Sequence, residues 1–75
     1  MNKTQVLKFI GKRRAEKIAE LDVYMINGVW CIDAIAHDEF ADRDGCGTFV
    51  MEGYDETPRE IMECFRAFID ELEAA

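Results

Sequence analysis

The dipeptide Asn27-Gly28 interrupts a segment, residues 21–36, in which apolar and polar side chains alternate. Alternation with a period of two is typical of a β-strand that buries one face. Asn-Gly suits a two-residue hairpin turn, because both central positions of that turn need a positive φ. The sequence therefore predicts an antiparallel hairpin that turns at Asn27 and Gly28.

The turn also predicts the register of the hairpin and sorts its side chains between two faces. Counting outward pairs Met25 with Trp30 and Val23 with Ile32 on one face, and Tyr24 with Cys31 and Asp22 with Asp33 on the other. The two aspartates mark the second face as the wetter one. That face is nevertheless apolar at Tyr24, Ile26, Val29, Cys31 and Ile35. Three explanations stay open: a contact surface, partial cover by the long loop, or a different register.

The second half of the chain predicts a loop, a third strand and a helix. Residues 37–47 form the loop, and Thr48–Gly53 alternate as a strand with Phe49 and Met51 facing inward. Thr57 as N-cap, Pro58 at the first helical position and Glu60 three residues after the cap form a capping box. The helix should run close to the C-terminus, and Arg66 can pair with Asp70 one turn later. Its expected buried stripe consists of Ile61, Cys64, Phe65, Phe68 and Leu72.

The N-terminal segment predicts an amphipathic basic helix. Thr4 is its expected N-cap, and the apolar positions Leu7, Ile10, Ile18 and Leu21 share one side. Gly11 costs about 1 kcal/mol inside a helix. The helix therefore begins either at Thr4 or near Lys12, in which case residues 6–10 are extended.

These elements predict an α+β fold of order αβββα in a single domain, residues 1–75. A three-stranded antiparallel sheet carries both helices on its Trp30 face. Trp30 and Phe65 are expected to meet in the core between the sheet and the second helix.

Charge is sorted along the chain. Residues 1–20 carry six basic and two acidic side chains, whereas residues 21–75 carry three and fourteen. The net charge of −7 thus combines a basic head with an acidic body, which favours a partner with a basic surface and disfavours nucleic acid. No apolar run reaches the roughly 20 residues needed to cross a bilayer, so no membrane contact is expected. An odd cysteine count and no leader-like start predict reduced thiols in the cytoplasm.

The residues that commonly carry catalysis or bind metals do not form a recognisable pattern. No serine occurs, and the single histidine, His37, has no local cysteine-protease motif around it. The Asp-Arg-Asp-Gly stretch at residues 42–45 is a fragment of a calcium loop, but Phe40 and Met51 fall where that loop needs carboxylates. Cys31, Cys46 and Cys64 lack a close pair of the kind that zinc sites use. We therefore expect no catalytic residue, no cofactor and no metal, and hence no enzyme.

Two resemblances bear on function. Residues 10–18 resemble the second half of a helix-hairpin-helix motif, in which amides at a glycine turn meet a nucleic-acid phosphate, although Phe9 stands where that family uses a second glycine. In size, acidity and element order the whole chain is similar to some phage-encoded anti-CRISPR and anti-defence inhibitors. That resemblance implies a viral protein that binds and inhibits a complex in the host cytoplasm, without a shared motif that would transfer site residues. Double-stranded-RNA-binding domains share the element order, but acidic residues stand where they carry lysine and arginine.

The functional hypothesis is a small, acidic, non-enzymatic inhibitor or adaptor, monomeric or homodimeric, that binds a basic protein surface, including one that otherwise holds nucleic acid. The expected partner-binding residues are Asp38, Glu39, Asp42, Asp44, Asp55, Glu56, Tyr24 and Ile26. One alternative is a nucleic-acid-binding module that uses Lys8, Lys12, Arg13, Arg14 and Lys17. Another is an antitoxin-like regulatory partner, because residues 28–72 share the strand-strand-helix order of small antitoxin domains.

Overall fold

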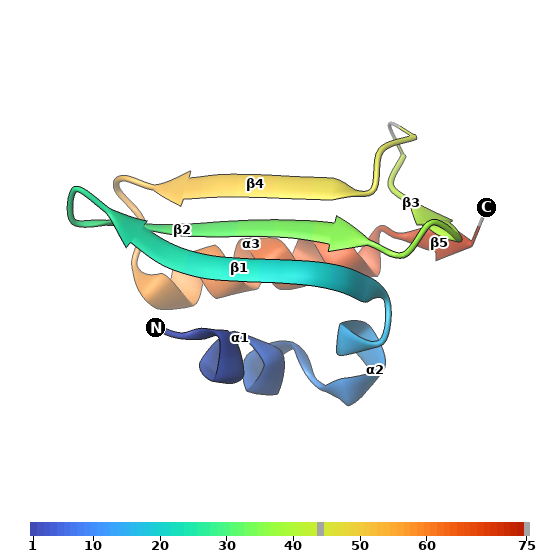
Figure 1. Cartoon of the computed structure of the whole chain (residues 1–75), viewed down its shortest axis with the longest axis horizontal. Coiled ribbons are helices and arrows are strands. Elements are labelled where there is room, and N and C mark those ends of the chain that lie inside the picture. The colour runs from blue at the N-terminus through green and yellow to red at the C-terminus, as the bar shows by residue number, and fades with distance from the viewer. Residues whose placement is uncertain (44, 75) are drawn as a thin grey trace.

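Three antiparallel strands form a sheet in the order β1-β2-β4, and the helices pack on one face of it (Figure 1). The fold comes from a computed structural model that describes residues 1–43 and 45–74. Its elements, in chain order, are α1 (Lys3–Ile10), α2 (Lys12–Ala15), β1 (Ile18–Ile26), β2 (Val29–Ala36), β3 (Phe40–Ala41), β4 (Thr48–Gly53), α3 (Pro58–Asp70) and β5 (Glu73–Ala74). The predicted α+β class and three-stranded sheet are confirmed, while the first predicted helix is divided into α1 and α2.

The hairpin has the predicted turn and register. Asn27 and Gly28 have φ values of 51° and 78°, the left-handed conformation that the turn requires. All the predicted cross-strand pairs are present: Met25 with Trp30, Val23 with Ile32, Tyr24 with Cys31, and Asp22 with Asp33. The third strand, β4, has the predicted bounds and pairs with β2. Phe49 and Met51 of β4 face the core, as expected.

Helix α3 begins as predicted but buries a slightly different stripe. The Thr57 hydroxyl accepts a hydrogen bond from the Glu60 amide, and the Glu60 side chain accepts one from the Thr57 amide. The buried residues of the helix are Ile61, Phe65 and Ile69. The prediction for Cys64 was wrong, since its side chain is exposed. A spacing of four residues keeps Ile61, Phe65 and Ile69 on one line, and Cys64 lies beside that line.

Arg66 does not form its predicted ion pair with Asp70. Asp70 instead accepts two hydrogen bonds from the Arg14 guanidinium, from Nε to Oδ1 at 2.7 Å and from Nη2 to Oδ2 at 3.3 Å. Arg66 lies over the ring of Phe9, with its guanidinium carbon 4.6 Å from the ring centroid. A bidentate ion pair between two helices is a stronger interaction than a single ion pair one turn apart on the same helix.

The N-terminal segment differs most from the prediction. Asn2 rather than Thr4 caps α1, because Asn2 and Gln5 form a reciprocal capping box. The backbone leaves the helix at Gly11, where φ is 88°. Residues 6–10 are therefore helical and not extended, and the segment from Ile18 onward belongs to β1 instead of the helix. Two expected stripe residues, Ile18 and Leu21, thus lie on a strand.

The predicted loop contains a short strand that the sequence analysis missed. Phe40 and Ala41 of β3 pair with Ala74 and Glu73 of β5, so the loop is tied to the last described residues of the chain (Figure 1). Strands of two residues are too short to show a period in the sequence.

The core lies between the sheet and the helices. Phe65 is fully buried, and its ring lies 5.2 Å from that of Phe49 and 6.4 Å from that of Phe68, measured between centroids. Trp30 packs against the same core and is partly exposed. Trp30 and Phe65 thus belong to one core, whereas the ring contacts of Phe65 are with Phe49 and Phe68.

Candidate functional site

The sheet has one face that no helix covers in the described part of the chain (Figure 1). Because side chains alternate along each strand, the register defines which residues lie on it. We call this surface the open face; it comprises Glu20, Asp22, Tyr24, Ile26, Val29, Cys31, Asp33, Ile35, Thr48, Val50 and Glu52. The expected interface residues Tyr24 and Ile26 both lie there.

The open face is negatively charged and has no basic member. Its carboxylates are Glu20, Asp22, Asp33 and Glu52, and neither lysine nor arginine occurs among its residues. Asp22 lies directly opposite Asp33, which places two like charges in one cross-strand pair. Directly opposed like charges destabilise a sheet. The isolated chain thus carries an unfavourable interaction at the centre of this face.

Asp33 is held by Tyr24. The Tyr24 hydroxyl donates a hydrogen bond of 2.8 Å to Asp33 Oδ2. This bond, assisted by desolvation, raises the pKa of Tyr24 to about 12. The other oxygen, Asp33 Oδ1, is buried and accepts no hydrogen bond from the residues that the structure describes.

Apolar side chains on the open face are unusually exposed. Val50 is 65% exposed, Ile26 55% and Ile35 44%. A shallow depression of about 280 Å³ brings Ile35 and Val50 together with Asp22 and Asp33. This part of the open face therefore combines exposed apolar groups with carboxylates, and exposed apolar patches are a common feature of surfaces that bind other molecules.

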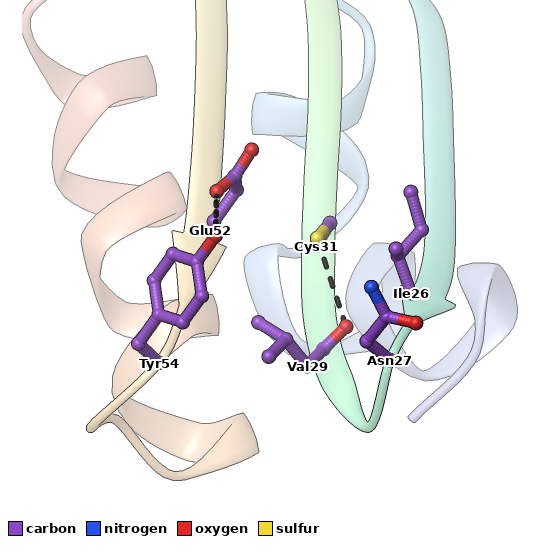
Figure 2. A pocket seen from close by; sticks show the side chains of 6 residues that line it. All are labelled: Ile26, Asn27, Val29, Cys31, Glu52 and Tyr54. Atoms are coloured by element: carbon purple, nitrogen blue, oxygen red, sulfur yellow. Dashed lines mark hydrogen bonds between the residues drawn. The ribbon is translucent and has the colours of Figure 1, made fainter.

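A smaller hollow lies at the hairpin end of the open face (Figure 2). Tyr54, which follows β4, donates a hydrogen bond of 2.6 Å from its hydroxyl to Glu52 Oε2. That bond raises the pKa of Tyr54. Cys31 lies on β2, the central strand, and is only 3% exposed. The pKa of its thiol is raised first by burial and then by the charges of Glu52 and Asp33.

The acidic residues that the sequence analysis proposed for binding lie at both ends of the open face. Asp38, Glu39 and Asp42 belong to the loop after β2, and Asp55 and Glu56 follow β4 at its other end. All but the half-buried Asp42 are exposed. Asp42 Oδ1 accepts a hydrogen bond from the Cys46 amide, and the predicted Asp44 lies outside the described residues. The two groups are therefore separated by the length of β4 and do not form one cluster.

The four carboxylates of the open face were not among the proposed binding residues. The sequence held a signal for them, because counting by twos from the Asn27-Gly28 turn places Asp22 and Asp33 beside Tyr24. The same alternation in β4 places Val50 and Glu52 on that face.

The basic residues proposed for nucleic-acid binding are partly engaged within the chain. Arg14 is paired with Asp70 and also donates to the Ile10 carbonyl. The Lys17 ammonium lies 5.6 Å from the centroid of the Phe40 ring. The Gly11 amide, at the turn that resembles a helix-hairpin-helix, donates to the Leu7 carbonyl. These interactions reduce what the segment can offer to a phosphate.

Cysteine and histidine side chains are scattered. Cys31, Cys46 and Cys64 are free thiols, and Cys31 alone of the three is buried. His37 is exposed in the loop after β2. Within residues 1–43 and 45–74, no three Asp, Glu, His or Cys side chains are grouped so that they could hold a metal ion.

Comparison of the chain with protein-family models, with curated proteins and with solved structures finds no match. No helix in the described part of the chain combines the length and the apolar character needed to cross a membrane.

Proposed function

We propose that this chain is a small, non-enzymatic inhibitor or adaptor that binds a basic protein surface through the open face of its sheet. The observation that carries the proposal is the composition of that face, which joins four carboxylates to exposed apolar side chains and includes no lysine or arginine. Charge complementarity would supply the specificity and the rate of encounter, and the apolar side chains would supply buried area.

The opposed pair of Asp22 and Asp33 favours a basic partner in particular. A lysine or arginine from the partner would lie close to both carboxylates and would offset their repulsion. Binding would therefore remove an unfavourable interaction that folding leaves in place. A second copy of this chain, docked face to face, would add to that repulsion instead.

The resemblance in size, acidity and element order to anti-CRISPR and anti-defence inhibitors supports a more specific form of the proposal. In that form, the chain acts in the host cytoplasm and occupies a surface that otherwise binds nucleic acid. Such a surface is basic because it neutralises phosphates. A captured partner should then lose its nucleic acid as this chain is added, which a competition assay with labelled nucleic acid measures.

The test uses three immobilised forms of the chain: wild type, Asp22→Lys and the control Glu16→Lys. Both variants change the net charge equally, but Glu16 is exposed at the end of α2, on the helical side of the molecule. The lysine introduced by Asp22→Lys faces Asp33, so the fold should be retained. We expect a basic protein to be retained by wild type and by Glu16→Lys, released by salt, and lost from Asp22→Lys.

If the three forms retain the same proteins in the same amounts, the open face is not the interface. A retained partner with an acidic contact surface would also contradict the proposal.

A further inference from the structure

The hollow at the hairpin end of the open face has the size of a side-chain site. It is lined by Ile26, Asn27, Val29, Cys31, Glu52 and Tyr54 and holds about 80 Å³. A water molecule occupies about 30 Å³ of liquid, and sites for small molecules span about 300–1,000 Å³. The hollow therefore has room for the end of one side chain and not for a cofactor.

The lining is mainly apolar, with the Asn27 amide on one side and the Glu52 carboxylate on the other. Figure 2 shows Ile26 and Asn27 on one side, Tyr54 and Glu52 on the other, and Val29 and Cys31 of β2 between them. Tyr54 is 70% exposed, so a flat group can stack on its ring. Its hydroxyl fixes the Glu52 carboxylate, which has capacity for further donors. Neither lysine nor arginine is among the lining residues.

We propose that this hollow receives an arginine side chain of the basic partner. The proposal rests on the proposed function, which supplies the basic protein that carries the arginine. A guanidinium is planar, weakly hydrated and always charged, so it stacks on Tyr54 while donating to Glu52. Its aliphatic stem lies against Ile26 and Val29. A lysine ammonium is compact and strongly hydrated, and loses more on entering a hollow with one carboxylate.

The test is a titration of the isotope-labelled full chain with short blocked peptides, followed by NMR. The probes are acetyl-Gly-Arg-Gly-amide and its lysine, citrulline and norleucine counterparts. We expect the arginine peptide to shift the backbone amide signals of Val29, Cys31 and Glu52 at millimolar concentrations. It should bind at least about threefold more tightly than citrulline, which has the same shape without the charge.

Variants at Glu52 and Tyr54 locate the effect, with Glu16→Gln as the control. Glu52→Gln keeps an acceptor for the Tyr54 hydroxyl and should weaken arginine binding at least about threefold, whereas Glu16→Gln, which removes the same charge elsewhere, should not. Tyr54→Phe keeps the ring and should retain more affinity than Tyr54→Ala.

Equal binding of all four peptides, or equal effects of Glu52→Gln and Glu16→Gln, would overturn the proposal. Stronger binding of the lysine or the norleucine peptide would overturn it as well. These outcomes are distinct from failure of the proposed function. If a basic partner is lost with Asp22→Lys but kept with Glu52→Gln and Tyr54→Ala, the open face is the interface and the arginine site is wrong. If the arginine peptide binds but no partner depends on Asp22, the reverse holds.

Discussion

Asp22 and Asp33 place two like charges in one cross-strand pair, and the proposed function would use that pair to bind a basic partner. They are paired directly across β1 and β2, and no basic residue of the open face lies between them. Residues that break a local rule of stability often do so for function. A change at one of these aspartates is therefore expected to raise stability and to weaken binding.

We expect Asp22→Asn to raise the melting temperature by about 1 to 4 °C, because it removes the like-charge repulsion. The same change should weaken binding to a basic partner. Circular dichroism measures the first effect and surface plasmon resonance the second. Asp38→Asn, which removes a charge that lies outside the sheet, is the control and should leave the melting temperature unchanged. A lower melting temperature for Asp22→Asn would contradict the role of repulsion.

Tyr24 should report on Asp33 through its titration. The pKa of Tyr24 is raised to about 12 by its hydrogen bond to Asp33, against an ordinary value of 10.0. Folding therefore favours the neutral phenol, so its contribution to stability is complete below pH 10 and is lost as the pH rises toward 12. Absorbance at the tyrosinate band should show Tyr24 titrating late, and Asp33→Asn should move its pKa back toward the ordinary value. A Tyr24→Phe variant identifies which phenol is observed.

At the scale of elements, helix α3 and strand β4 approach closely at Gly53. A methyl group built on Gly53 would lie 2.2 Å from Ile61 Cδ1 and 2.7 Å from its Cγ1. Ile61 is fully buried, so it has little room to move. Gly53 does not have a positive φ, so its backbone conformation does not require glycine. The close approach of Ile61 is what requires it, because there is no space for a larger side chain.

We expect Gly53→Ala to destabilise the chain by about 1 to 3 kcal/mol, the usual cost of overpacking a core. Ile61→Val removes the atom that lies closest, so the double variant should be more stable than the sum of the two single changes predicts. Denaturant titration of the four forms measures this coupling. Strict additivity would mean that the helix moves away freely and that the contact is not rigid.

The packing of Phe65 tests whether the core lies between α3 and the sheet. This residue is fully buried and packs on Phe49 and Phe68. Phe65→Ala should lower the free energy of unfolding by about 3 to 5 kcal/mol, which is enough to unfold a domain this small. Phe68→Leu, at a partly exposed neighbour, should retain a cooperative melt. A barely shifted melting curve for Phe65→Ala would show that the core lies elsewhere.

The sequence predicted those elements whose local chemistry agrees with their packing. Asn27-Gly28 predicted the hairpin and its register, and Thr57 with Glu60 predicted the start of α3. It did not predict the N-terminal segment, where several polar residues compete as caps and where Gly11 gives two possible boundaries. The β3–β5 pair was missed because its formation depends on residues about thirty positions apart. The open face was only partly predicted. Its apolar members on β1 and β2 and the pair Asp22 and Asp33 were placed on it, but Val50 was missed and none of its four carboxylates was proposed for binding.

At the scale of the whole molecule, acidic residues extend the open face at both ends. Asp38 and Glu39 are exposed in the loop next to Ile35, and Asp55 and Glu56 are exposed after Tyr54. Charges at the rim of an interface mainly steer the encounter, whereas buried groups govern dissociation. The two acidic ends are therefore expected to act on the rate of association.

We expect the double change Asp38→Lys and Glu39→Lys to slow association with a basic partner more than it speeds dissociation. The difference from wild type should shrink as salt is added, because screening shortens the reach of exposed charges to about 8 Å at physiological ionic strength. Stability should hardly change, since exposed charges contribute little. Surface plasmon resonance at several salt concentrations separates the two rates. An unchanged association rate would restrict recognition to the open face itself.

The alternation of side chains along β1, β2 and β4 has a consequence for how this protein can evolve. Inward residues of the strands build the core, and outward residues of the same strands form the open face. A substitution at Val50 or Glu52 therefore leaves the helix-facing packing untouched. Under the proposed function, such a chain can change what it recognises within a few mutational steps while its fold is retained, which is an advantage wherever the partner is itself under selection to escape.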